Sequence, residues 1–533
     1  MIDNKPIWVH FMQVETIHKN ALSFINSQNY EKAHQACLQI LQIDNQHADA
    51  YFLLGIIACA TGSMSKAISL IEKALSFTSD NSEYIAHLAK CYAFKGEKKK
   101  VELLCERAIQ LKPKQALTLD TIGTAFSRIG LYEKSVLYFQ HAVQKQPDNP
   151  AFLYNLGAAL RFMGDFDGAR RYFEQAISLN HKFYKAHSAL SGLRGITQES
   201  NHISRLQKLI NNSLQTDELL HICHAIASEY EALHQYDSAF EYLEKAKFKK
   251  RQQLNYQFSD DVAIFDEIFN YFQSEHLSAE SNCLTKDPIF VVGMPRTGTT
   301  LVERIISQHS QVASVGELQN FGILLKQLSK SSSRKVLDPE TILAAKDINY
   351  SQLGNGYIES TRILTGNKEK FVDKMPLNIL YAGFILQSMP NAKIICLDRH
   401  PLDTIISNFK QLFAVNFSYY NYAYALKTTA EFFVRFHQLR QFWQSRYPDN
   451  FLIVNYETLV NNPEVEAKKI ISHCSLEWQS TCLNIESNNT PVATASAVQI
   501  REPIHNRSVG HWKNYEKHLA EVKLMLDHAS INY

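Results

Sequence analysis

The chain has 533 residues, of which 45% are hydrophobic and 20% are charged, with only 14 prolines and 19 glycines. This composition excludes disordered, collagen-like and low-complexity proteins, and at roughly 100–200 residues per domain the length indicates several domains. The 55 basic and 53 acidic residues leave a net charge of +2, so no global field draws the chain to nucleic acid or to an anionic membrane. Any anion site must therefore be local.

The N-terminal residues predict no secretory signal, because charges and Pro6 interrupt them before an apolar run can form. The sequence contains no stretch of about 18 apolar residues, so it predicts no membrane span. We therefore expect a cytoplasmic protein. The cysteines are never closer than eight residues apart, a spacing that favours buried free thiols over disulfides or a zinc site, so we expect no metal. The chain also lacks GxSxG, HExxH and GxGxxG, which argues against a serine hydrolase, a zinc protease and a dinucleotide oxidoreductase.

The first part of the chain repeats with a period of 34 residues. Small residues occupy one phase of this repeat, namely Ala21, Gly55, Ala89, Gly123 and Gly157. Turn glycines occupy a second phase, where a left-handed residue would end one helix and let the next fold back: Gly62, Gly96, Gly130 and Gly164. Small residues are needed where the helices of a hairpin approach closely. The pattern resembles the tetratricopeptide repeat family over about residues 17–195, with a further repeat near residues 236–246.

This resemblance implies an α-solenoid over residues 1–254, degenerate in its last units, and a helical bridge over residues 255–285. Solenoids of this kind usually hold an extended peptide or another protein, so we expect a peptide or protein partner. Self-association into a homo-oligomer and simple structural support stay open as alternatives. The basic run at residues 245–251 is interpreted as a solvated helix face rather than a nucleic-acid patch.

A phosphate-binding loop is predicted after residue 288. Residues 289–292 form a short apolar run typical of a buried strand, a glycine-containing loop follows from Gly293, and an amphipathic run starts at Leu301. In a strand–loop–helix unit of this kind, backbone N–H groups and the helix N-terminus converge on an anion. The pattern GxxxxG-Thr-Thr departs from GxxxxGK[ST], with Thr299 in place of the lysine and Arg296 supplying charge inside the loop. We therefore expect a phosphorylated nucleotide whose tail is shorter than that of ATP·Mg²⁺ and differently charged.

The loop at residues 295–300 resembles the 5′-phosphosulfate loop of sulfotransferases that use 3′-phosphoadenosine-5′-phosphosulfate (PAPS), the protein-tyrosine sulfotransferase branch in particular. The resemblance covers about residues 286–520, and its further elements follow in the family's order. They are Gly316-Glu317, the strand-like runs 371–376, 393–401 and 451–457, and the run 497–501 with Trp512. Leu318 replaces the family's second acidic residue, and the region around Glu502 is one residue longer. Repeats joined to such a domain are similar to a group of bacterial proteins.

The resemblance implies roles in a sulfuryl transfer that requires no metal. Glu317 is the implied general base, Lys374 would act on the bridging oxygen, and Arg296 on the sulfonate or the 5′-phosphate. Arg399 and Ser407 would bind the 3′-phosphate. The other residues implied in donor binding are Thr297, Gly298, Thr299, Thr300, Tyr456, Ser496 and Arg501. His309 is a rival base, because the cytosolic branch of the superfamily uses histidine. Each assignment has a structural alternative. Glu317 could have no chemical role, Lys374 and Arg296 could form ordinary salt bridges, and Tyr456 could be a core residue at a strand end.

We therefore predict an α-solenoid joined to a P-loop-like α/β domain with a parallel sheet over residues 286–533. The expected function is PAPS-dependent transfer to an acceptor hydroxyl; a tyrosine is favoured, and a glycan or a small alcohol stays open. The alternatives are a repeat scaffold whose second domain only holds nucleotide and, less favoured, a P-loop kinase. An aromatic cluster is interpreted as packing rather than acceptor contacts: Phe417, Tyr419, Tyr420, Tyr422 and Tyr424.

Overall fold

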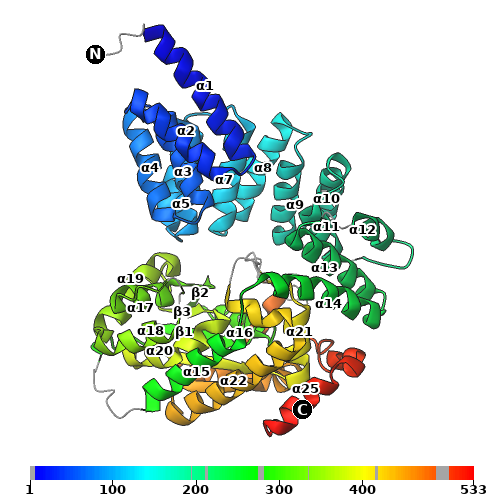
Figure 1. The fold of residues 1–533 in the computed structure, drawn as a ribbon. Helices are drawn as coiled ribbons and strands as arrows, with labels where there is room; N and C mark the ends of the chain where they lie inside the picture. The colour runs from blue at the N-terminus through cyan, green and yellow to red at the C-terminus, as the bar shows by residue number, and fades with distance from the viewer. Residues whose placement is uncertain are drawn as a thin grey trace. The chain divides into compact units, whose positions relative to one another are not determined.

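The computed structural model describes residues 7–193, 195–210, 214–273, 281–333, 335, 337–413, 418–487 and 503–533. The chain divides into two compact units, Met1–Ala186 and His187–Tyr533 (Figure 1). In the described part of the chain, no helix is long and apolar enough to cross a membrane. All nine cysteines are free and all except Cys59 are buried, which agrees with the expected free thiols.

The first unit is a run of packed helix hairpins, coloured blue to cyan in Figure 1. Its helices are α1 (Ile7–Asn26), α2 (Tyr30–Ile43), α3 (Ala48–Ala60), α4 (Met64–Phe77), α5 (Ser82–Phe94), α6 (Lys98–Gln110), α7 (Ala116–Arg128), α8 (Tyr132–Lys145), α9 (Pro150–Met163) and α10 (Phe166–Leu179). The short helix α11 (Tyr184–Ser191) follows.

The repeated small residues and glycines have the roles that the 34-residue pattern predicts. A Cβ atom at Gly55 would lie 2.6 Å from Ile71 Cγ1, so helices α3 and α4 approach too closely for a side chain there. Gly164 has φ 91° and ends α9 in the left-handed conformation. The other turn glycines share this positive φ: Gly62, Gly96 and Gly130. The repeat register read from the sequence is confirmed.

In the described part of the second unit, the end of α11 is followed, before the sheet, by α12 (Ile203–Leu209), α13 (Thr216–Ala232), α14 (Tyr236–Gln253) and α15 (Phe258–Gln273). The sheet strands are β1 (Pro288–Gly293), β2 (Val312–Gly316), β3 (Lys370–Asp373), β4 (Lys393–Asp398) and β5 (Phe451–Asn455). They pair in the order β2-β3-β1-β4-β5, and every pairing is parallel. The predicted parallel α/β domain is confirmed. Its carboxyl edge collects the loops that follow all five strands.

Helices cover both faces of this sheet because the strands are apolar on both sides. The helices between and after the strands are α16 (Thr299–Ser307), α17 (Asn320–Ser329), α18 (Pro339–Ala344), η1 (Ala345–Asp347), α19 (Tyr350–Thr365), η2 (Pro376–Tyr381), α20 (Ala382–Ser388), α21 (Pro401–Lys410), η3 (Ser418–Tyr424), α22 (Leu426–Arg446), α23 (Tyr456–Asn461), α24 (Pro463–His473), η4 (Ser480–Leu483), η5 (Ile485–Ser487), η7 (His511–His518) and α25 (Ala520–His528). Along β1, Ile289 and Val291 join a core with α16 and α24. Phe290 and Val292 point to the opposite core, which includes α15, α20 and α22.

The helix pair α13–α14 packs against the α/β domain. Ala239, Phe240 and Leu243 share a buried cluster with Ile406 and Phe409 of α21. The compact second unit thus begins at His187, within the range 1–254 that the repeat pattern suggests for the solenoid. The two divisions differ because a repeat pattern follows sequence period whereas a compact unit follows packing. We keep 1–254, 255–285 and 286–533 as a proposal for the sequence modules.

Candidate active site

The glycine-containing loop joins β1 to α16 at the carboxyl edge of the sheet. Its backbone takes left-handed values at Arg296 (φ 68°) and Gly298 (φ 101°). The Thr297 hydroxyl donates to the Met294 carbonyl oxygen at 2.7 Å and closes the loop on itself. A Cβ atom at Gly298 would lie 2.5 Å from Tyr456 Cδ2, so glycine is required where the loop meets this ring. Thr299 and Thr300 then begin α16, with side chains that are largely buried.

Helix α21 holds the loop from its other side. Asn408, which is fully buried, donates from Nδ2 to the Pro295 carbonyl oxygen at 2.7 Å. Arg399 donates from Nη1 to the Arg296 carbonyl oxygen at 2.8 Å. Sequence reasoning missed Asn408; the available signal was an amide in the middle of the apolar face of a predicted helix. These two bonds fix the position of the loop relative to the end of β4.

Arg399 is 7% exposed and lies at the centre of several interactions. Its guanidinium also donates to the Ser508 carbonyl oxygen, lies 3.8 Å from an Asp403 carboxylate oxygen, and sits 5.0 Å from the centre of the Tyr456 ring. Its Nε has no hydrogen-bond partner among the described residues. Since a guanidinium carries five N–H donors, Arg399 retains capacity for an anion. Ser407 follows on α21, half-buried, two helical turns further along.

The C-terminal segment is anchored to the same helix. Asp403 is fully buried and accepts from the Gly510 N–H at 2.7 Å and from the Trp512 N–H at 2.8 Å. The Trp512 ring stacks on the His400 ring, with centroids 5.4 Å apart and planes 18° apart. The segment around Trp512 therefore lies against the end of β4.

Glu317 and Lys374 meet at the ends of the neighbouring strands β2 and β3. Lys374 is only 2% exposed and forms an ion pair with Glu317, whose side chain is 43% exposed. The Lys374 N–H donates to the Gly316 carbonyl oxygen at 2.9 Å, which fixes the two segments together. A buried ammonium thus stands beside a carboxylate that solvent can reach.

Asp373, the last residue of β3, lies next to Lys374 in the chain and helps to hold the turn that carries Glu317. It accepts from the Tyr357 hydroxyl at 2.7 Å and from the Leu318 N–H at 3.3 Å, and burial raises the pKa of its carboxyl to about 7. The second bond holds the turn that carries Glu317. Sequence reasoning did not single out Asp373, since an aspartate at a strand end has many uses.

Two guanidinium groups come together at the loop. Arg399 donates to the Arg296 carbonyl oxygen, and burial, followed by the like charge of Arg399, lowers the pKa of Arg296. Tyr456 begins α23 after β5, and burial raises the pKa of its hydroxyl. Next to it, the Glu457 carboxylate accepts from the His400 N–H at 3.1 Å. The loops after β1, β4 and β5 are thereby joined in one polar network.

The rival base His309 is engaged elsewhere. It follows the C-terminal end of α16, is 1% exposed, and accepts from the Gln311 N–H through Nδ1 at 3.2 Å. Its Nε2 then donates to the Glu477 carbonyl oxygen at 2.9 Å. Both ring nitrogens are used by backbone groups, so His309 has a structural role. The candidates Ser496 and Arg501, and Phe417 of the aromatic cluster, lie outside the described residues. Within the described ranges, no group of three or more His, Cys, Asp or Glu side chains could hold a metal ion.

The fold and the site define an α/β domain with an anion-binding loop at the carboxyl edge of a parallel sheet. The model of the sulfotransferase family matches residues 288–480, and tetratricopeptide repeat models match residues 24–91, 150–183 and 220–247. The chain therefore carries a sulfotransferase-family domain together with tetratricopeptide repeats, as the resemblances implied.

Known proteins are similar to parts of the chain. An uncharacterized protein of Aquifex aeolicus (strain VF5) is 32% identical over 294 residues, which are 54% of this chain and 38% of that protein. A protein-tyrosine sulfotransferase of Drosophila melanogaster is 23% identical over 235 residues, 42% of this chain and 46% of that protein. The chain thus spans less than half the length of each of these relatives. Among solved structures, the sulfotransferase domain from the curacin biosynthetic pathway is 20% identical with a TM-score of 0.31, covering 46% of this chain and 98% of that domain.

Proposed function

We propose that the protein transfers a sulfuryl group from PAPS to an acceptor hydroxyl, with Glu317 as the general base. One observation carries the proposal: the loop after β1, the Glu317–Lys374 pair and Arg399 all lie at the carboxyl edge of one parallel sheet. This edge is where open α/β sheets bind their ligands. The matching sulfotransferase family model supports the reaction class.

The residues present fit a nucleotide that carries phosphate groups at both the 5′ and the 3′ positions of its ribose. Gly298 lets the Tyr456 ring approach the loop closely, and the backbone N–H groups of a loop that leads into a helix N-terminus would bind an anion. Arg296 and the threonines of the loop would bind the 5′-phosphosulfate. Arg399, with its unpartnered Nε, and Ser407 would bind the 3′-phosphate. Tyr456 would contact the adenosine.

Each group of the site has a definite chemical task in this proposal. The donor supplies an activated sulfuryl group. Glu317, because it is partly exposed, would accept the proton of an acceptor hydroxyl that approaches from solvent. Lys374 would stabilise the negative charge that grows on the leaving oxygen, where burial strengthens its effect. Arg296 would hold the transferred group in line with the acceptor.

A tyrosine in a peptide or protein is the acceptor that we favour. A relative is a protein-tyrosine sulfotransferase, and repeats like those of the first unit commonly bind extended chains. A glycan or a small alcohol is the alternative. We keep the cytoplasmic location as a prediction.

Two measurements test the proposal. Calorimetric titration of the full-length protein with 3′-phosphoadenosine 5′-phosphate (PAP), ADP and ATP·Mg²⁺ should show clear preference for PAP. Labelled PAPS should then transfer sulfate to a member of a panel of tyrosine peptides, glycans and phenols. Preference for ATP·Mg²⁺ would identify a kinase instead, and PAP binding without transfer to any member would favour a repeat scaffold that only holds nucleotide.

A further inference from the structure

The last repeat hairpin, α13–α14, reaches into the α/β domain with a buried lysine. Lys247 of α14 is 2% exposed, although it belongs to the basic run that the sequence suggests is solvated. Its Nζ donates to the Ala423 carbonyl oxygen at 2.9 Å and to the Gln411 carbonyl oxygen at 3.2 Å. In sequence these carbonyls lie 176 and 164 residues from the lysine. One side chain thus joins the end of α21 to the end of η3.

No carboxylate of the described residues neutralises this ammonium group within ion-pair distance. Instead, its Nζ lies 5.2 Å from the centre of the Phe409 ring and 5.3 Å from that of the Tyr424 ring. Burial lowers the pKa of Lys247 to about 7. Burying an amine without a carboxylate partner costs free energy of folding, and the two hydrogen bonds of Lys247 offset part of that cost.

Both segments that Lys247 joins lead to the candidate active site. Through α21, Asn408 supports the glycine-containing loop at Pro295, and the Tyr422 hydroxyl of η3 donates to Asn408 Oδ1 at 3.0 Å. Through η3, Tyr419 lines a small cavity with Leu377 and Leu380 of η2, the helix that begins two residues after Lys374. Tyr420 is the next residue, and burial, followed by the negative charge of Glu317, raises the pKa of its hydroxyl. The Tyr420 ring also stacks on Phe413, with centroids 4.3 Å apart. We call Phe413 and Tyr420 the aromatic pair.

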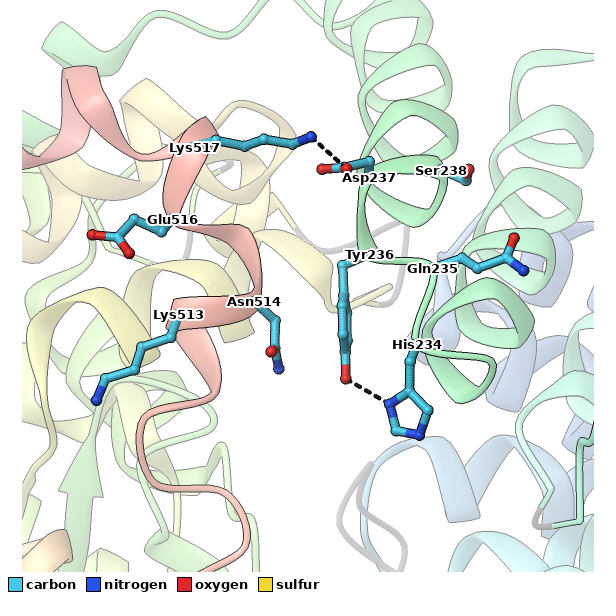
Figure 2. A pocket seen from close by; sticks show the side chains of 9 residues that line it. All are labelled: His234, Gln235, Tyr236, Asp237, Ser238, Lys513, Asn514, Glu516 and Lys517. Atoms are coloured by element: carbon cyan, nitrogen blue, oxygen red, sulfur yellow. Dashed lines mark hydrogen bonds and ion pairs between the residues drawn. The ribbon is translucent and has the colours of Figure 1, made fainter.

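The hairpin has a second, outer contact with the domain, which is polar and open. Figure 2 shows Lys517 of η7 reaching Asp237 at the start of α14. A hollow of about 700 Å³, lined mostly by polar side chains of both segments, lies beside this pair. Tyr236 lies in this region and bonds His234 of the hairpin turn at 2.9 Å. Exposed ion pairs of this kind contribute little to binding. Tyr424 of η3 also packs against Leu220 and Ala246 of the hairpin, so the hydrogen bonds of Lys247 add to an apolar contact with η3.

We propose that the last repeat hairpin is a working part of the transferase site, in which Lys247 is a positioning residue that holds the aromatic pair beside Glu317 for the acceptor. The transfer part of this inference rests on the proposed function. The local part, that Lys247 orders η3, does not. An aromatic ring beside the base would stack on an aromatic acceptor, so the hairpin would affect the affinity for the acceptor more than that for the donor.

The test compares Lys247→Met with Lys249→Met in the full-length protein. Both changes remove an amine from α14, and Lys249 is exposed. Hydrogen exchange at residues 418–424, measured without any ligand, should be about fivefold faster or more in Lys247→Met and unchanged in Lys249→Met. With p-cresol as the acceptor, Lys247→Met should raise the acceptor KM by about fivefold or more, while PAP binding by calorimetry changes less than about twofold.

Each outcome decides a separate statement. Unchanged exchange and an unchanged acceptor KM in Lys247→Met would overturn the positioning role. An equal loss of PAP and acceptor binding would overturn it too, because that pattern indicates general destabilisation. If the unmodified protein binds no PAP, the proposed function fails, and the exchange data still decide whether Lys247 orders η3.

A milder variant keeps the inference testable if Lys247→Met does not fold. Glu231 of α13 pairs with Lys410, at the end of α21, and lies 3.3 Å from His511 Nε2, so Glu231→Gln loosens the hairpin at the surface. It should accelerate exchange at residues 418–424 by about twofold relative to Glu241→Gln, an exposed control on α14. Equal exchange in the two variants would overturn the role of the hairpin.

Discussion

Asn408 donates a hydrogen bond from its side-chain amide to the carbonyl oxygen of Pro295, over 2.7 Å and across 113 residues of sequence. Its Oδ1 accepts from the Tyr422 hydroxyl at 3.0 Å. The same buried amide therefore touches the glycine-containing loop on one side and η3 on the other. This arrangement makes Asn408 the residue that fixes the glycine-containing loop and η3 relative to each other.

Asn408→Ala should weaken PAP binding and lower stability. The change leaves the Pro295 carbonyl and the Tyr422 hydroxyl without a partner, and each unsatisfied buried group costs about 1–3 kcal/mol. We expect PAP affinity to fall about tenfold by calorimetry and the midpoint of urea unfolding to decrease. The exposed Asn45→Ala variant serves as the control and should leave both quantities unchanged. Unaltered PAP affinity in Asn408→Ala would show that the loop holds its shape without this bond.

Glu317→Gln should abolish transfer while sparing the donor site. A general base typically contributes about 10²–10⁴-fold to the rate, so the rate constant for sulfate transfer should fall by that order. Because Glu317 pairs with Lys374 rather than with the loop, PAP affinity should stay within about twofold of that of the unmodified protein. Glu359→Gln, on an exposed part of α19, is the matched control. Full activity in Glu317→Gln would discard Glu317 as the base.

Arg399→Ala should reduce affinity chiefly through the 3′-phosphate. A charge-assisted bidentate contact to phosphate accounts for a large part of binding, so PAP affinity should fall by about 10²-fold. AMP, which lacks the 3′-phosphate, should lose less, because only the support that Arg399 gives to the Arg296 carbonyl is removed. The measurement is a calorimetric comparison of the two nucleotides. Equal losses for PAP and AMP would assign Arg399 to loop support alone.

Asp403→Asn should release the segment that follows Ser508. The buried carboxylate accepts two backbone N–H groups and balances Arg399, and an amide can replace only part of this acceptor capacity. We expect stability to fall by about 1–3 kcal/mol and Trp512 to become more accessible to a fluorescence quencher. Asp449→Asn, at a surface turn, is the control. If quenching is the same in both variants, Asp403 does not hold this segment.

Lys247 should make the stability depend on pH in the alkaline range. Its pKa falls from 10.5 to about 7 on folding, so between these values the unfolded chain binds more protons than the folded one. Stability should therefore rise with pH from about 7 to about 10, with a slope of at most about 1.4 kcal/mol per pH unit from this group. Lys247→Met should flatten the slope of urea-unfolding free energy against pH.

Among the neighbouring groups, Cys223 and Tyr424 reduce the slope only above about pH 9, because burial raises their pKa values to about 11 and about 12. His224, which faces Lys247 from α13, has its pKa lowered to about 3 by burial and by the charge of Lys247, so it titrates well below the range. Lys410, the other nearby cation, is paired with Glu231. A slope that is the same in Lys249→Met and Lys247→Met would mean that other groups govern the pH dependence.

The sequence predicted those parts of the fold that local patterns determine. A period of 34 residues sets the turn glycines, and short apolar runs between helices set the parallel sheet with the loop from Gly293. The candidate residues at the strand ends follow from the same patterns, and their chemical roles stay predictions. Ser496 and Arg501 lie beyond the described residues.

Residues whose partners are distant in sequence could not be predicted. Lys247 and Lys250 belong to a basic run, yet the first is buried against carbonyls from α21 and η3, and the second pairs with Asp217 at 2.6 Å. Asn408 donates to the Pro295 carbonyl oxygen, 113 residues away along the chain, and Asp403 accepts from N–H groups 107 and 109 residues away. Periodicity reports which face of a helix is apolar, and it carries no information on which polar residue meets which loop.

The burial of Lys247 has a consequence for how such a protein can be cut or recombined. A shortened chain starting at residue 286 would lack α14, and Ile406, Phe409 and Tyr515 would lose the apolar residues that cover them. Such a fragment should aggregate when expressed alone, whereas one starting at residue 187 should stay dispersed. The last hairpin and the α/β domain therefore form one structural piece, and exchanging repeats between related proteins should succeed only upstream of this hairpin.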